Sequence, residues 1–208
     1  MRGLKNRFGS TDEMGIFKMS SDGLEEVKNP SQIFISERPE NASGSIIVPI
    51  MDGNRVILIE IQALVTDTAY STPQRLTTGI NKKRLSILLA VLEKKLGFNF
   101  KASDVHVNIT GGLYASEPAI DLGIVFSVIS SFRDFPVDSN TAVLGEVGLT
   151  GEVRAVNLFN KRIKELKKLG FKNIIVPSGN VQERKFDPEL NLIEIKNLQE
   201  GLDLYFNY

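Results

Sequence analysis

The segment Ala119–Ile129 constrains the fold of this chain more than any other part of the sequence. It is apolar at almost every position and directly follows Ser116-Glu117-Pro118, and proline suits the first turn of a helix. A helix that is apolar on nearly all sides is stable only when other elements bury most of its surface. The chain is therefore expected to enclose this helix among other helices and strands.

Further helices and strands are predicted on both sides of that segment. Apolar residues recur at helical spacing in three places, and runs rich in β-branched residues mark the strands. The predicted helices are Asn81–Leu96, ended by Gly97, Asn157–Leu169, ended by Gly170, and Leu198–Tyr205. The predicted strands are Ser45–Ile50, Arg55–Thr66 after a turn at Asp52-Gly53-Asn54, Val105–Thr110, Ala142–Leu144, Asn173–Val176 and Leu192–Ile195. Strands that alternate with helices predict an α/β domain.

Residues 1–40 differ in character from the rest of the chain. Two short β-forming runs around Ser20-Ser21-Asp22-Gly23 predict a hairpin. A short helical turn is expected to start at Asn29 and to run through Phe34. The stretch that follows is polar and rich in turn residues, so we place a domain boundary there. The two predicted units are residues 1–40 and 41–208.

The composition excludes several kinds of chemistry. The chain has 25 Lys+Arg and 25 Asp+Glu, so only local charge patches can argue for nucleic acid or a membrane. It has no Cys, which excludes disulfides, Cys-ligated zinc and a thiol nucleophile in these residues. The single histidine, His106, excludes a multi-histidine metal site, and we expect it to be a structural residue at a strand edge. No metal ligand set is predicted.

No apolar run reaches the roughly 18 residues that a membrane-spanning helix needs. The first residues also lack the apolar region of a secretory signal peptide. We therefore expect a cytoplasmic protein that does not enter a membrane.

The search for a phosphate-binding loop gives one weak candidate. No Gly-x-x-x-x-Gly-Lys-Ser/Thr segment occurs, so the chain has no P-loop of its own. Gly111-Gly112 follows a predicted strand and precedes the apolar helix, where a phosphate can bind. The alternative is a tight connection, which Glu117 favours because its charge would repel an anion. A small enzyme that acts on a phosphate ligand stays open as one interpretation.

Two segments resemble a known family. They are Ser116-Glu117-Pro118-Ala119-Ile120-Asp121-Leu122-Gly123 and the run from Gly145-Glu146-Val147-Gly148 to Asn160-Lys161-Arg162. Together they resemble the peptidase domain of Lon proteases, over about residues 45–205. The resemblance implies an α/β fold of the Lon peptidase-like (ribosomal protein S5 domain 2-like) kind. In that family the first segment carries a nucleophilic serine at a helix start, and the second carries a lysine general base.

This sequence departs from the Lon pattern at both decisive positions. Ala119 stands where the resemblance implies the serine, and Asn160 stands where it implies the lysine. Ser116 and Lys161 lie close by, but a shift of one residue along a helix turns a side chain by about 100°. We therefore expect Lys161 to face solvent and this chain alone to have no enzymatic activity. An active Ser-Lys endopeptidase of the Lon type is the alternative.

Motifs along essentially the whole chain resemble the bacterial RadA (Sms) family of DNA repair and recombination proteins. They include Lys5-Asn6-Arg7-Phe8-Gly9, Arg75-Leu76-Thr77-Thr78-Gly79-Ile80 and Ser130-Ser131-Phe132-Arg133-Asp134. The resemblance implies the C-terminal part of an ATP-driven DNA motor. Residues 1–40 would be the last hairpin of its RecA-like ATPase domain, and residues 41–208 a degenerate Lon-like domain. ATP and magnesium, and zinc in an N-terminal finger, would belong to the full-length protein.

The same resemblance implies the partners of the chain. They are further copies in a hexameric ring, single-stranded or branched DNA, and the recombinase RecA. Lys5 and Arg7 would reach the γ-phosphate bound by the neighbouring subunit of such a ring.

Basic residues in two places are candidate DNA contacts. One group opens the first long helix and the other lies on the helix predicted at Asn157–Leu169. The candidates are Arg75, Lys82, Lys83 and Arg84 in the first group, and Lys161, Lys164 and Lys168 in the second. Such cations can follow a phosphate backbone. The alternative is that each group is an ordinary solvated helix face.

Overall fold

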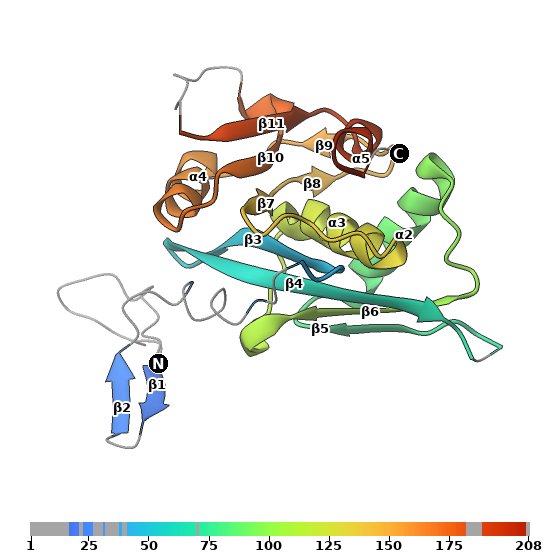
Figure 1. Ribbon diagram of the computed structural model, residues 1–208, viewed down its shortest axis with the longest axis horizontal. Helices are drawn as coiled ribbons and strands as arrows, with labels where there is room; N and C mark the ends of the chain where they lie inside the picture. The colour runs from blue at the N-terminus through green and yellow to red at the C-terminus, as the bar shows by residue number, and fades with distance from the viewer. Residues whose placement is uncertain are drawn as a thin grey trace.

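The computed structural model describes residues 17–20, 23–26, 31, 38, 41–69, 71–181 and 189–206. Seven strands form the main sheet: β3 (Ser45–Asp52), β4 (Arg55–Asp67), β5 (Arg75–Thr78), β6 (Ser103–Ile109), β7 (Thr141–Val143), β10 (Asn173–Pro177) and β11 (Asn191–Ile195). Their order across the sheet is β11-β10-β7-β3-β4-β6-β5 (Figure 1). The pairs of β4 with β3 and with β6 are antiparallel, and the other neighbouring pairs are parallel. The predicted α/β class is confirmed.

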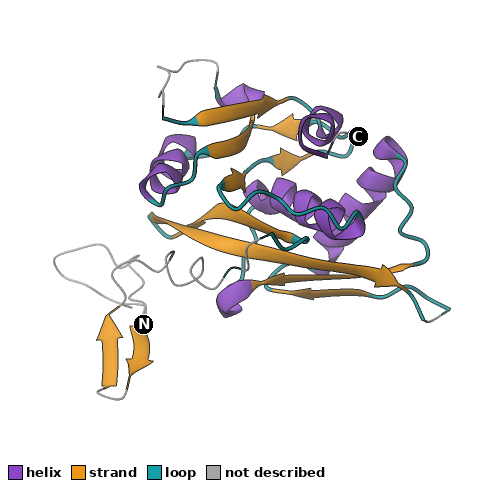
Figure 2. Cartoon of the chain, viewed as in Figure 1, coloured by secondary structure: helices purple, strands orange, loops and turns teal. Residues whose placement is uncertain are grey.

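Helices cover both faces of this sheet (Figure 2). They are α2 (Lys82–Leu96), α3 (Asp121–Phe132), α4 (Phe159–Lys168) and α5 (Leu198–Phe206). One apolar core lies between α2, α3, α5 and one face of the sheet. A second core lies between α4 and the other face. Strand β4 contributes to both, because Ile57 and Ile59 face the first core and Leu58 faces the second.

Short elements complete the fold. They are the 3₁₀ turns η1 (Thr110–Gly112), η2 (Pro118–Ile120) and η3 (Ser178–Asn180), and the strands β1 (Phe17–Ser20), β2 (Gly23–Glu26), β8 (Glu146–Val147) and β9 (Val153–Arg154). The β1–β2 pair is the predicted hairpin, and its antiparallel register is confirmed. Strand β5 and the β8–β9 pair were not predicted from the sequence.

The strand hairpin and the first long helix follow the sequence closely. Asp52 pairs with Arg55 at the end of the β3–β4 ladder, so Gly53 and Asn54 make the turn. Helix α2 begins after Asn81, whose side chain accepts a hydrogen bond of 2.8 Å from the Lys83 amide. It ends at Gly97, which has a φ of 71° and so takes the left-handed conformation that favours glycine. Both predictions are confirmed.

The apolar helix α3 lies in the centre of the molecule, as its composition requires. Every residue from Asp121 to Ser130 is buried. Gly123 lets the helix approach β3, because a Cβ there would lie 2.3 Å from Cγ2 of Val48. The close packing of helix and strand thus depends on the absence of a side chain at this position.

Two residues before the main sheet contact the larger domain. The Ser31 hydroxyl accepts a hydrogen bond of 3.0 Å from the Leu58 amide on β4. The Arg38 guanidinium donates to the Ser45 hydroxyl at 2.8 Å and to the Ser139 carbonyl at 3.0 Å. These contacts cross the boundary predicted at residues 40 and 41, and the division into two domains stays a prediction. The helical turn predicted from Asn29 to Phe34 lies outside the described residues, apart from Ser31.

Among the described residues, every helix is too short or too polar to cross a membrane.

Candidate functional site

The two positions where the Lon pattern is broken lie in different surroundings. Ala119 is buried in η2, just before α3, and packs in the second core. Asn160 is exposed in the first turn of α4. Ser116 and Lys161, the two neighbouring substitutes, are both exposed. Lys161 is exposed as predicted, but Asn160 is exposed as well, so the turn of about 100° between them does not separate a buried side chain from an exposed one.

A buried arginine lies where α4 approaches the start of α3. The Arg162 residue is only 1% exposed, and its guanidinium forms an ion pair with Glu117. It also donates to the Pro49 carbonyl on β3 at 2.6 Å and to the Asn157 carbonyl at 3.0 Å. The Glu117 carboxylate in turn accepts from the Met51 amide at 2.7 Å. These bonds tie α4, β3 and the start of α3 together.

A second ion pair lies at the first residue of α3. Arg84 of α2 donates from Nε to Oδ1 of Asp121 at 2.7 Å, and its other nitrogen pairs with Oδ2. The same guanidinium donates to the Val147 carbonyl at 2.8 Å, while the Val147 amide donates to Asp121 at 3.1 Å. The pair therefore joins α2, α3 and β8.

Burial changes the pKa of the Asp121 carboxyl in this pair. Desolvation raises the pKa of the Asp121 carboxyl, although the hydrogen bonds from Arg84 and the Val147 amide oppose that effect. The hydrogen bond to Asp121 raises the pKa of the Arg84 guanidinium. An arginine with a raised pKa does not release its proton near neutral pH. Arg84 is therefore a structural cation and not a general base.

Among the predicted basic residues of the first group, two are held by hydrogen bonds or an ion pair, and two are exposed. Arg75 donates to the Phe100 carbonyl at 2.7 Å and to the Ser103 carbonyl, and Arg84 is committed to Asp121. Lys82 and Lys83 are exposed at the start of α2. The structure thus brings two lysines, and not two arginines, to the surface here.

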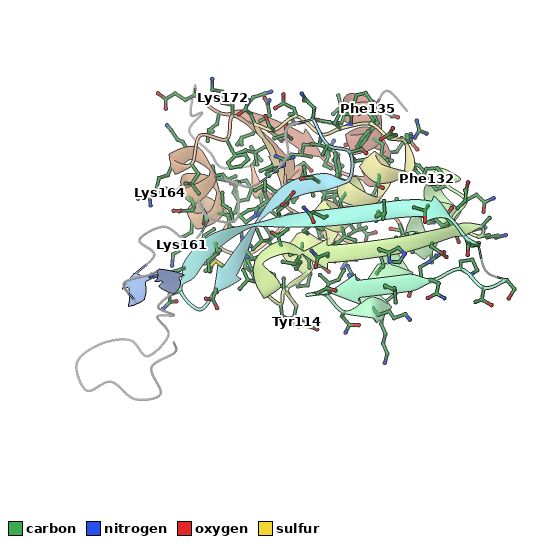
Figure 3. All side chains as sticks on the ribbon, turned by 60° about the horizontal axis from the view of Figure 1, so that its bottom comes forward. Tyr114, Phe132, Phe135, Lys161, Lys164 and Lys172 are labelled. Carbon is green, nitrogen blue, oxygen red and sulfur yellow. The ribbon has the colours of Figure 1, made fainter. Side chains whose placement is uncertain are left out.

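The lysines of α4 form an exposed row. Lys161, Lys164 and Lys168 are exposed on the helix, and Lys168 lies 3.7 Å from Glu165. Lys172 is exposed just beyond the helix. Figure 3 shows the labelled lysines along one edge of the molecule. We call Lys161, Lys164, Lys168 and Lys172 the α4 lysine row.

A pocket of about 240 Å³ opens beside the start of α3. Tyr114, Ser116 and Glu146 line it together with Asn81 and Arg84 of the α2 region. Tyr114 is 64% exposed. In Figure 3 it lies at a different edge from the labelled Lys161, Lys164 and Lys172. The pocket is therefore lined by an exposed aromatic side chain and by charged side chains, of which Arg84 and Asp121 form an ion pair.

Gly111, Gly112 and His106 are not among the residues that line this pocket. Gly111 and Gly112 form η1 and both have positive φ, which is the geometry of a tight connection. His106 lies on β6, between β4 and β5, so it is in an interior strand and not at the predicted edge. It is flanked in register by the exposed Leu64 and Leu76. These three residues help to line a second, open pocket of about 470 Å³.

Some site residues were missed by sequence reasoning, and others cannot be placed. The two ion pairs join residues 45 and 37 positions apart, which no local pattern reveals. The sequence held one indication that Arg162 is buried: it lies three residues after the inward-facing Phe159, on the same side of α4. Lys5 and Arg7 lie outside the described residues.

Comparison with known proteins gives the class first. The chain is an α/β domain whose central helix begins between two ion pairs. Residues 71–180 match the family described as "Subunit ChlI of Mg-chelatase", which covers about half of the chain, and the chain belongs to this family.

Curated relatives are named DNA repair protein RadA. The relative from Bacillus subtilis (strain 168) is 48% identical over 202 residues, which cover 97% of this chain and 44% of that protein. The relative from Halalkalibacterium halodurans is 45% identical over 204 residues, 98% of this chain and 45% of that protein. The relative from Streptococcus pneumoniae is 45% identical over 206 residues, 99% of this chain and 49% of that protein. The chain thus spans about half the length of these relatives, and the resemblance to RadA is confirmed.

Proposed function

We propose that this chain is the C-terminal, non-proteolytic Lon-like part of a RadA-type DNA repair and recombination ATPase. Its role in the longer protein is ring assembly and DNA contact. The observation that carries the proposal is the chemistry at the start of α3, where Ala119 presents a methyl group. The buried cation nearby is Arg162, already paired with Glu117. A guanidinium stays protonated and cannot take a proton from a serine.

A protease assay tests the absence of peptidase chemistry. We expect no cleavage of casein by the purified chain above the buffer rate, with or without Ser116→Ala or Lys161→Ala. The reason is that Ser116 and Lys161 are both exposed, whereas a Ser-Lys dyad needs a desolvated lysine within reach of the serine. Cleavage that either substitution abolishes would establish the Ser-Lys endopeptidase instead.

DNA contact is assigned to lysines on two surfaces. Lys82 and Lys83 are exposed at the start of α2, and Lys161, Lys164 and Lys168 of the α4 lysine row follow one face of α4. Exposed ammonium groups can neutralise phosphates and release their counterions. The guanidiniums of Arg75 and Arg84 bond to carbonyls and to Asp121, so we assign these two predicted residues a structural role beside the lysines.

Nucleotide chemistry belongs, in this proposal, to other parts of the longer protein. No phosphate-binding loop occurs in this sequence, so ATP and magnesium would bind in the ATPase domain and zinc in a separate finger. Lys5 and Arg7 would stabilise charge on a phosphoryl group in the neighbouring subunit of a hexameric ring. Alanine at either position in the full-length protein should lower ATP hydrolysis while leaving nucleotide binding within about twofold. A role beside RecA and a cytoplasmic location follow from the same proposal.

A phosphate-ligand enzyme is the remaining alternative, and it depends on Gly111-Gly112. Calorimetry of this chain with ATP separates it from the main proposal. We expect no saturable heat, because the turn is a tight connection with both glycines at positive φ and Glu117 lies at the neighbouring helix start. Saturable binding that Gly112→Ala removes would favour the enzyme.

A further inference from the structure

We propose that Tyr114 stacks on a base of single-stranded DNA while Lys82 and Lys83 hold the adjacent phosphates. We call these three residues the Tyr114 platform. The inference deepens the proposed DNA contact and rests on it, since it names the site and the type of strand that binds there.

Tyr114 is a large aromatic residue that the fold leaves uncovered. Its 64% exposure is unusual for a ring that could otherwise bury much apolar area. The backbone next to Tyr114 is held in place, because the Ala115 amide donates a hydrogen bond of 2.9 Å to the Gly79 carbonyl. A flat, solvent-exposed ring on an anchored backbone is the geometry of a stacking residue.

The anchor also joins the loop that carries Tyr114 to the segment just before the two lysines. Gly79 has a φ of 78°, and a Cβ there would lie 2.4 Å from the Leu113 carbonyl oxygen. The loop that carries Tyr114 is therefore in close backbone contact with the residues that precede α2. Asn81 and Tyr114 line the same pocket, and Lys82 and Lys83 follow Asn81 directly as the first residues of the helix.

The exposed start of α2 is basic, while the pocket beside it holds both carboxylates and an arginine. The first turn of α2 contains no acidic residue, although acids are the residues that stabilise a helix N-terminus. Of the carboxylates that line the pocket, Glu117 and Asp121 are neutralised by their arginine partners. Glu146 lies close enough to Arg84 to raise that group's pKa. Lys82 and Lys83 are exposed at the start of α2, next in sequence to the pocket residue Asn81.

A single strand fits this arrangement better than a duplex. An unpaired base exposes a face that can stack on a tyrosine ring, and stacking tolerates any base sequence. In a duplex the base faces are already covered by their neighbours. The α4 lysine row offers charge without an exposed aromatic ring among its members, so it can contact phosphates of either form.

Photo-crosslinking tests the inference on the chain as it exists. A thymidine oligonucleotide with one 5-iodouracil should form an adduct on Tyr114 that is found by mass spectrometry of the digested complex. Affinity is measured in parallel by fluorescence anisotropy with a labelled oligonucleotide. We expect Tyr114→Ala to weaken binding about 5- to 150-fold and Tyr114→Phe to stay within about twofold, because phenylalanine keeps the stacking face.

The salt dependence separates stacking from charge. Tyr114→Ala should leave the slope of log K against log salt unchanged. Lys82→Gln with Lys83→Gln should reduce its magnitude by about 1.4, that is about 0.7 for each single-strand phosphate. Unchanged thermal unfolding of each variant shows that the fold is retained, since all three side chains are exposed.

Each contrary result has a distinct meaning. If Tyr114→Ala binds as tightly as the parent chain while substitutions in the α4 lysine row weaken binding, the Tyr114 platform is wrong and the proposed function stands. Adducts found only on other aromatic residues have the same meaning. If no oligonucleotide binds the parent chain, both proposals fail. If an unfolded polypeptide binds at Tyr114 and unlabelled DNA does not displace it, the Tyr114 platform is a peptide site and the inference is wrong.

Discussion

Glu117 and Arg162 lie 45 positions apart in the sequence and form an ion pair at the start of α3. The Arg162 side chain is 2% exposed and that of Glu117 is 25% exposed. The Arg162 guanidinium also bonds to β3 and to the segment before α4. The pair therefore holds three elements together.

Loss of one partner of this pair should destabilise the fold. Arg162→Met leaves the Glu117 carboxylate without its main partner, and such a change costs about 3–5 kcal/mol. The measurement is the free energy of unfolding from urea denaturation followed by circular dichroism. Arg154→Ala is the matched control, because the Arg154–Glu152 pair is largely exposed and exposed pairs contribute little to stability. Equal losses for the two variants would contradict the structural role of Arg162.

Replacing both partners should be less harmful than replacing one. The double variant Glu117→Met with Arg162→Met removes both charges, so neither is left uncompensated. We expect its free energy of unfolding to lie above that of Arg162→Met alone. A double variant less stable than either single variant would show that the pair contributes more than mutual neutralisation.

Gly123→Ala should also destabilise the protein. The added Cβ would lie 2.3 Å from Val48 Cγ2, and overpacking of a buried contact costs about 1–3 kcal/mol. The gain in helix propensity, at most about 1 kcal/mol, does not offset this. Gly201→Ala on α5 is the control, since its nearest neighbour is Cδ1 of Ile195 at 3.0 Å, a side-chain end that can move. Thermal unfolding should rank Gly201→Ala well above Gly123→Ala, and the reverse order would contradict the packing argument.

Acid should weaken the fold through Glu152. Hydrogen bonds from the Thr150 hydroxyl and the Glu152 amide, and from Arg154, lower the pKa of this carboxyl from 4.5 to about 2. A carboxyl with a lowered folded-state pKa stabilises the protein above its unfolded pKa, and this stability is lost as the pH falls through the folded pKa. The contribution of Glu152 should thus disappear between about pH 4.5 and pH 2. Unfolding measured in that window should depend less on pH in Glu152→Gln, and an unchanged dependence would contradict the assignment.

The α4 lysine row should contribute charge but no sequence preference to DNA binding. Lys161→Gln, Lys164→Gln and Lys168→Gln together should reduce the salt slope by about 2 for single strands and weaken binding to all sequences alike. A triple variant of Lys94, Lys95 and Lys101 is the control, because these lysines are exposed elsewhere. Equal effects of the two triple variants would mean that the row is an ordinary solvated face.

Much of the fold could be predicted because local signals agree with the tertiary structure. Asn81 and Gly97 mark the ends of α2 by their own chemistry, and the turn at Gly53 sets the β3–β4 register. Strand β5 was missed because it is four residues long, with alternate residues exposed on an edge strand. Strand β5 is held by its pairing with β6, which comes later in the sequence, and the residues of β5 alone do not indicate this pairing.

The site could be predicted only in part, for a similar reason. The substitutions at Ala119 and Asn160 are visible in the sequence, and so are the lysines. The commitment of Arg84 to Asp121 and of Arg162 to Glu117 depends on how three helices meet around β3 and β8. The exposure of Tyr114 depends likewise on the close contact of its loop with Gly79. A positive side chain in a sequence does not reveal whether its charge is already satisfied.

The central claim is that this domain contacts DNA, and light scattering tests it most directly. The mass of the chain is measured alone and with about 100 µM of a single-stranded oligonucleotide, a concentration that saturates most non-specific sites. We predict a rise in mass by whole oligonucleotides, reversed by high salt and smaller in the lysine variants. A mass that does not change with the oligonucleotide at low salt would contradict the account.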